Sequence, residues 1–175
     1  MNRRLTFATM ALGALAVLAT PIMPVAAAPV GPHAAVCEAG GRSVTVRVTG
    51  FRVRTGRVRV QLYAANPSTF LERGRWLQRV EVPASGSGDL EICVPVAAAG
   101  RYAVMVRHDA NANGDNDRAD GAGFSGNPRI SVLDLALRRK PPIERVAFAV
   151  GAANVTQRVV LNYVQGTRFE PIARR

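Results

Sequence analysis

Hydrophobic and polar residues alternate along much of the chain, and this pattern predicts β-strands with one buried face. The alternation is strict over 44–49 and 57–62, where valine or leucine takes every second position. The Thr55-Gly56 pair between these two stretches indicates a hairpin-type turn. About seven strands are predicted, over 44–49, 57–62, 77–82, 90–94, 102–106, 144–150 and 155–164.

Strands joined by short turns, with almost no helix, predict an all-β fold. We expect an antiparallel seven-strand sandwich, immunoglobulin-like or transthyretin-like in its layering, with a small closed barrel as the alternative. The stretch Ser131 to Lys140 fits a short helix or a strand equally well. Residues 66–75 are predicted to form a loop with one helical turn, capped by Ser68, with Phe70 in the core and Trp76 partly buried.

The first 27 residues have the features of a secretory signal peptide. Arg3 and Arg4 precede an apolar run over 5–18, and small residues follow at 25–28. We expect cleavage after Ala27, with a retained membrane anchor as the alternative. The remaining chain divides into a flexible leader over 28–42, a β-sandwich over 43–165 and a polar, frayed tail over 166–175. No later stretch is apolar enough to span a bilayer, so the mature protein is expected in the periplasm or outside the cell.

The two cysteines, Cys37 and Cys93, fit the same oxidising compartment. Neither belongs to a CxxC motif of the kind that binds metal, so we predict a structural disulfide between them. It would tie the leader to the strand over 90–94. The chain-entropy estimate for such a loop is on the order of 4 kcal/mol of stabilisation.

The chain is strongly basic, with a formal net charge of +11. Nearly all the positive charge is arginine, which fits either an anionic partner or a solvated surface. The arginines are scattered without interleaved aromatics, so nucleic acid is not expected as a partner. A basic stripe of Arg47, Arg57 and Arg59 would form if their strands were adjacent, and it would suit a surface or anionic-glycan-binding module.

The most specific chemical signal is a run of aspartate and asparagine after the strand over 102–106. It matches the calcium-loop pattern D-x-[DN]-x-[DN]-G, whose alternate residues point oxygen ligands at one centre. The expected ligands are Asp109, Asn111, Asn113, the Asp115 carbonyl, Asp117 and Asp120, with Gly114 at the sharp turn. Four of the chain's 12 acidic residues lie between 109 and 120, a crowding that a cation would relieve.

Two other interpretations of this loop stay open. Asn, Asp and Gly are also the ordinary residues of long turns, because their side chains bond nearby backbone groups. A metal-dependent hydrolase would use His108, Asp109, Asp117 and Asp120, but it needs a second titratable group nearby. We expect His108 to bond a backbone group instead. The sequence has no nucleophile, phosphate-loop or dinucleotide motif, so we predict that the protein is not an enzyme.

The run G-x-Y-A-V-x-V-x-H-D-x-N-x-N-G-x-x-D, followed by G-F-S, spans Gly100 to Ser125. It resembles the DUF2141 family of uncharacterised exported bacterial proteins. The resemblance covers roughly 43–164 and implies one exported β-sandwich domain without established catalytic residues. Only 118–122 separate Asp117 from Gly123-Phe124-Ser125, which is shorter than the usual family pattern, so ligands beyond Asp117 are not implied by the family.

Together these features predict an exported, non-enzymatic β-sandwich module with a calcium-binding loop at 109–120. Calcium would order the loop and present Phe124, with His108 nearby, to a partner such as a cell-envelope protein or an anionic glycan. The alternative is the surface or glycan-binding module that uses exposed arginines.

Overall fold

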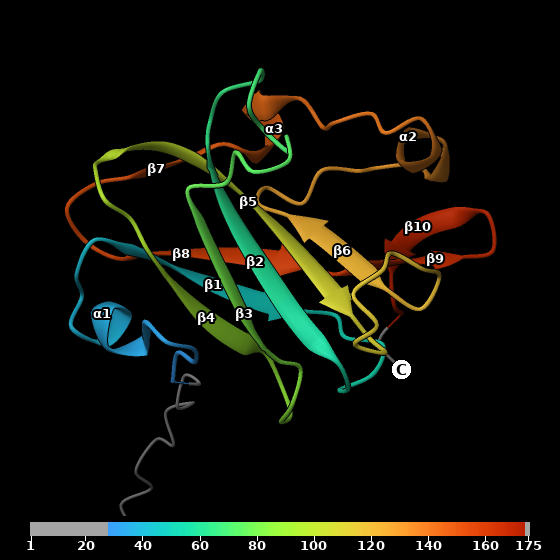
Figure 1. Cartoon of the computed structure of the whole chain (residues 1–175), viewed down its shortest axis with the longest axis horizontal. Coiled ribbons are helices and arrows are strands. Elements are labelled where there is room, and N and C mark those ends of the chain that lie inside the picture. The colour runs from blue at the N-terminus through green and yellow to red at the C-terminus, as the bar shows by residue number, and fades with distance from the viewer. Residues whose placement is uncertain (1–27, 174–175) are drawn as a thin grey trace, which may run out of the picture.

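The computed structural model describes residues 28–173, which form two β-sheets and three short helices (Figure 1). The predicted signal peptide over 1–27 lies outside the described residues. In chain order the elements are α1 (Ala34–Glu38), β1 (Ser43–Thr49), β2 (Arg57–Ala64), β3 (Gln78–Pro83), β4 (Leu90–Pro95), β5 (Gly100–Asp109), β6 (Gly121–Phe124), α2 (Val132–Ala136), α3 (Ile143–Val146), β7 (Phe148–Val150), β8 (Val155–Val160), β9 (Asn162–Gln165) and β10 (Arg168–Pro171).

The smaller sheet has the strand order β4-β1-β8, and the larger one has the order β10-β9-β6-β5-β2-β3, with β7 paired to β5. This confirms a sandwich-like all-β fold. The described residues contain ten strands instead of seven, and β1 pairs with β8 in parallel while the other pairings between these ten strands are antiparallel. The purely antiparallel prediction was therefore wrong at this one pair.

The single strand predicted over 155–164 is in fact two strands in different sheets. β8 belongs to the small sheet and β9 to the large one, and Leu161 lies between them. The predicted inward face is confirmed, since Val159, Leu161 and Tyr163 are fully buried. Alternation alone cannot show the division, because a chain that crosses from one sheet to the other around a shared core keeps its period of two.

The main hydrophobic core lies between the two sheets. The small sheet contributes the β1 valines and Ile92, and the large sheet contributes the inward residues of β2 and β5. A second cluster, which includes Tyr63, Phe70 and Phe124, packs under α3 and the loop over 66–76. Phe70 is buried and Trp76 is half-buried, as predicted. One helical turn is present within 66–75, since the Phe70 N–H donates to the Asn66 carbonyl at 2.9 Å. Its cap is Asn66 instead of Ser68, because the Asn66 side chain accepts the Ser68 N–H.

Three local predictions need correction, and one stretch that the sequence left open is resolved. The predicted leader contains α1, and Val30 in it bridges to Ile92 of β4. The tail predicted to fray contains β10, which pairs with β9 along its length. The strand predicted over 144–150 is α3 followed by the short β7, because the prolines Pro141-Pro142 set up a helix start. The undecided stretch at 131–140 contains α2, which Ser131 and Asp134 hold with a capping box.

The predicted disulfide is confirmed. Cys37 of α1 bonds to Cys93 of β4, with their Cα atoms 5.9 Å apart. Both sulfurs are buried, so the bond fixes α1 against the small sheet. Over 28–173, no helix is both long and apolar enough to pass through a bilayer.

Candidate functional site

The Asp/Asn loop joins β5 to β6 at one end of the large sheet (Figure 1). These two strands pair directly, with His108 opposite Gly121 and Met105 opposite Phe124. The loop is therefore a long hairpin connection whose two ends the sheet holds together. We refer to residues 109–120 as the acidic loop.

A buried arginine of β5 reaches into the acidic loop. The guanidinium of Arg107 donates to the carbonyl oxygens of Gly114 (3.1 Å) and Asp115, and to Asp120 Oδ2 at 3.2 Å. It also lies 3.7 Å from Asp109 Oδ2. Arg107 thus supplies an internal positive charge to a loop with four aspartates. Sequence reasoning missed this residue, although it stands two positions before Asp109 and therefore on the same face of the strand.

The buried aspartates at the two ends of the loop differ in how their oxygens are satisfied. Asp120 accepts the Ala110 N–H through Oδ1 (3.1 Å) and Arg107 through Oδ2. Asp109 Oδ2 accepts the Gly114 N–H at 2.9 Å. Asp109 Oδ1 is buried and has no hydrogen-bond partner. An unpaired buried carboxylate oxygen is costly, so it marks a position where a cation would be stabilised.

The exposed part of the loop is organised around Asp117. Its Oδ2 accepts from the side-chain amides of Asn111 (2.8 Å) and Asn113 (3.0 Å). The hydrogen bond from the Ala119 N–H, followed by that from Asn111, lowers the pKa of Asp117, so this carboxyl stays ionised at neutral pH. The two asparagines also accept the N–H groups two residues further on, which are Asx-turns.

The structure therefore divides the six predicted ligands into two groups. The carbonyl of Asp115 and the carboxylate of Asp120 are engaged by Arg107. Of the remaining four, Asn111 and Asn113 are hydrogen-bonded to Asp117, whereas Asp109 accepts the Gly114 N–H and lies near Arg107. Among residues 28–173, no group of three or more His, Cys, Asp or Glu side chains is placed to hold a metal ion. An ion in this loop would thus need the asparagine oxygens as well as the two aspartates.

His108 has the backbone-bonding role expected of it. Its Nε2 faces the Thr55 carbonyl at 2.8 Å and therefore donates, so Nδ1 accepts from the Tyr163 hydroxyl at 2.7 Å. Burial lowers the pKa of His108, partly opposed by the bond to Thr55, and burial raises the pKa of Tyr163 to about 12. His108 is fully buried with both nitrogens satisfied, so the prediction that it contacts a partner was wrong.

Phe124 is also buried, against Phe70 in the second cluster, and was wrongly predicted as a partner contact. The motif around it has packing roles. A Cβ at Gly121 would lie 2.5 Å from the Tyr163 ring, and one at Gly123 would lie 2.5 Å from the Val160 oxygen. Ser125 receives the Val104 N–H at 2.9 Å and donates to the Val146 carbonyl. The G-x-G-F-S run therefore holds β6 close to β9, β5 and α3.

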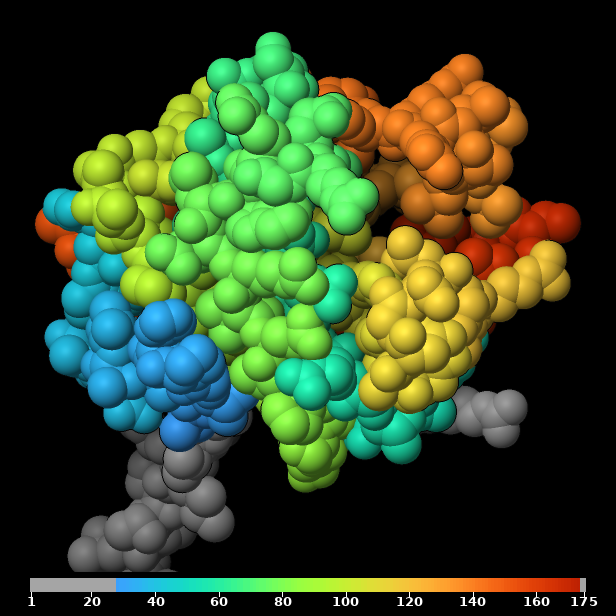
Figure 2. All heavy atoms as spheres, viewed as in Figure 1, coloured from blue at the N-terminus to red at the C-terminus, as the bar shows by residue number. Residues whose placement is uncertain are grey.

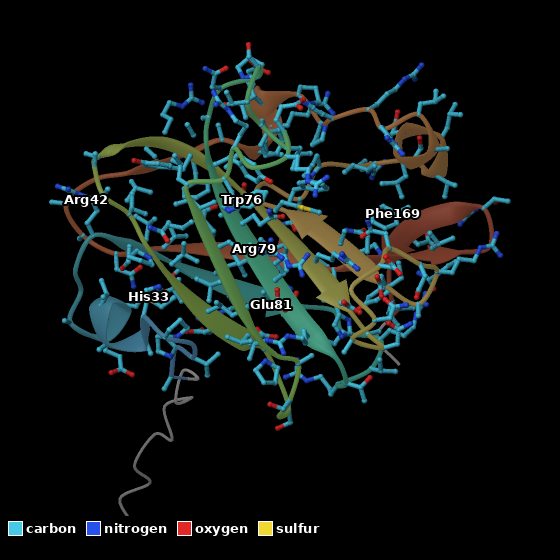
Figure 3. All side chains as sticks on the ribbon, viewed as in Figure 1. His33, Arg42, Trp76, Arg79, Glu81 and Phe169 are labelled. Carbon is cyan, nitrogen blue, oxygen red and sulfur yellow. A yellow bond between two sulfur atoms is a disulfide. The ribbon has the colours of Figure 1, made fainter. Side chains whose placement is uncertain are left out.

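The basic stripe considered from the sequence does not form. Arg47 lies on β1 in the small sheet, whereas Arg57 and Arg59 lie on β2 in the large one. Each of the three is also paired with a glutamate at 2.7–2.8 Å, Glu91 for the first and Glu81 for the other two. Figure 3 shows Glu81 near Arg79 and Trp76 over β2 and β3, where the Arg79 guanidinium lies 5.4 Å from the Trp76 ring centroid.

Comparison with known families gives one match. The model of the family described as an uncharacterized protein conserved in bacteria, DUF2141, matches residues 46–158. Comparison with curated proteins and with solved structures finds no significant match. The matched region runs from β1 into β8 and includes the whole acidic loop, the buried His108 and the G-x-G-F-S run. This chain is therefore a member of the DUF2141 family.

Proposed function

We propose that this protein is an exported, non-enzymatic β-sandwich module whose acidic loop binds calcium. The observation that carries the proposal is the buried Asp109 Oδ1, which has no hydrogen-bond partner while its companion Oδ2 is held by the Gly114 N–H. A calcium ion prefers such hard oxygens, and a loop with the ligand spacing described above can bring several of them together.

The ligands that support the proposal are Asp109, Asn111, Asn113 and Asp117. The amide nitrogens of the two asparagines donate to Asp117 while their oxygens accept backbone N–H groups, so each oxygen would use its second lone pair for the ion. Asp115 and Asp120 are assigned to Arg107 instead of to the ion. This is a narrower ligand set than the sequence pattern predicts.

Electrostatics also favour an added cation. Asp109, Asp115, Asp117 and Asp120 place four negative charges in the loop, and Arg107 neutralises one of them. The exposed Arg118 offsets a second negative charge, and solvent screens it as it screens the exposed Asp115 and Asp117. The loop keeps an excess of negative charge that calcium would reduce.

Two further observations support export and a non-enzymatic role. The Cys37–Cys93 disulfide is the kind of bond that persists in an oxidising compartment, which supports export. Both nitrogens of His108 are held by Thr55 and Tyr163, which leaves it without the role that a metal-dependent hydrolase would need from it.

Calcium is expected to raise the melting temperature of the protein relative to a sample with chelator. A ligand that binds only the folded state stabilises it by about 2.7 kcal/mol at a hundred times its dissociation constant. Thermal unfolding in millimolar calcium and in chelator, together with titration calorimetry, measures the effect. Superimposed melting curves with no heat of binding would exclude the calcium site.

A pair of variants with the same change of charge tests the ligand set. Asp117→Asn should abolish the calcium-dependent shift, because it replaces a proposed ligand carboxylate. Asp115→Asn should retain the shift, because the Asp115 side chain is exposed and only the backbone of this residue is held in the loop. Equal losses in both variants would indicate a general effect of loop charge instead of a site.

A further inference from the structure

The α2 region carries an exposed apolar surface that the acidic loop does not explain. Leu133, Leu135 and Leu137 are 60%, 37% and 53% exposed, and α2 buries none of its residues. Large exposed apolar side chains elsewhere in 28–173 are dispersed, whereas these three fall within five positions. We call residues 127–140 the α2 arm. Figure 2 shows α2 as a lobe that projects from the body beside β10.

The arm is held in shape without the leucines. Ser131 and Asp134 form the capping box, and Asp134 also accepts the Arg139 N–H through its carbonyl at 2.8 Å. Arg138 adopts a positive φ of 51°, which turns the chain after the helix. These contacts are local and polar. The exposed leucines therefore contribute to a surface and not to the stability of the arm.

Basic residues surround this apolar surface. Over 127–145 there are five basic and two acidic residues. Arg138, Arg139 and Lys140 follow the helix directly, although Arg139 lies 3.8 Å from Asp134 and Lys140 pairs with Glu72.

A groove of about 590 Å³ lies between the arm and β10. Ile130 and Val132 of the arm and Phe169 of β10 form part of its lining, and Figure 3 shows Phe169 at β10, below α2. Arg129 and Arg168 also line the groove. The basic residues therefore lie on both sides of the apolar surface, after the helix and beside the groove.

We propose that the α2 arm docks on the surface of an anionic phospholipid bilayer. Leucines on a projecting helix can enter the boundary between headgroups and acyl chains while arginine and lysine contact lipid phosphates. Each basic residue near an anionic membrane adds electrostatic attraction. Insertion of the leucines would also remove exposed apolar surface from water, which attraction between charges would not do. The site is separate from the acidic loop, so the proposal stands independently of calcium.

The test is co-sedimentation of the exported protein with vesicles, after its N-terminus has been established by mass spectrometry. Vesicles of equal parts phosphatidylglycerol and phosphatidylcholine should bind it, and pure phosphatidylcholine vesicles should bind it much more weakly. The double variant Leu133→Ser/Leu137→Ser should bind at least about tenfold more weakly than the unmodified protein, because two partly inserted apolar side chains are lost while the charge is kept. Arg138→Gln/Arg139→Gln should also weaken binding and reduce its dependence on salt.

Leu77→Ser is the matched control, because Leu77 is 54% exposed and precedes β3, outside the arm. It should bind as the unmodified protein does. The leucine variants should melt normally, since their side chains are not in the core. Equal binding by Leu133→Ser/Leu137→Ser and the unmodified protein would overturn the proposal, as would an equal loss in Leu77→Ser. Absence of binding to the anionic vesicles would overturn it as well.

Discussion

Replacement of Arg107 by methionine is expected to destabilise the protein by about 3–5 kcal/mol, the usual effect of removing one partner from a buried ion pair. Its guanidinium is the group that Asp120 and the carbonyls of Gly114 and Asp115 share, and the arginine is only 8% exposed. Methionine fills a similar volume but leaves these acceptors unpaired. Urea-induced unfolding in the presence of chelator measures the change in the free energy of unfolding.

Arg101→Met is the control on the same strand, because Arg101 is exposed near the start of β5. It should change the free energy of unfolding by less than about 0.5 kcal/mol, as is usual for a surface substitution. If the two variants unfold alike, Arg107 does not organise the loop. Addition of calcium should restore more stability to Arg107→Met than it adds to the unmodified protein, since the loop then carries a larger negative excess.

Gly56→Ala is expected to cost more than about 3 kcal/mol, because it combines backbone strain with overlap in a tightly packed place. Gly56 has a φ of +77°, which alanine adopts only with strain. A Cβ there would overlap the Asp109 carbonyl oxygen and would lie 2.7 Å from the Ala110 carbonyl carbon. The turn before β2 packs on the base of the acidic loop, so this variant should disturb both. Thermal and urea unfolding measure the loss.

Gly88→Ala separates the destabilisation caused by backbone strain from that caused by steric overlap. Gly88 has a similar φ of +73°, but no atom lies within 4 Å of the position its Cβ would take. It should therefore show the backbone strain alone, on the order of 1–2 kcal/mol. Equal losses in the two variants would mean that the contact between Gly56 and the loop adds nothing to stability.

These expectations give the family motif a structural meaning. His108 closes the turn before β2 through Thr55, and Thr55 Oγ1 also donates to the Ala110 carbonyl at 2.9 Å. Gly121 and Gly123 allow close contact with Tyr163 and Val160. Much of the motif therefore builds and positions the acidic loop. Residues 111–119 of that loop are exposed, and Asn111, Asn113 and Asp117 are the proposed ligands among them.

The sequence by itself determined the all-β class, the inward faces of the main strands, the cysteine pair and the position of the acidic loop. These features depend on local alternation, on composition and on the only two cysteines in the chain, so a single sequence contains them. Strands as short as β6 and β10 were missed, because four residues give too little alternation to detect.

The tertiary structure decided which groups meet. The pairing of β2 with β5, of β5 with β6 and of β6 with β9 brings Thr55, Tyr163 and the acidic loop around His108. It also directs Arg107 into the loop, which removes Asp115 and Asp120 from the predicted ligand set, and it places Arg47 in a different sheet from Arg57. Contacts of this kind join residues far apart in the chain or across a folded loop, and the periodicity of a sequence carries no information about them.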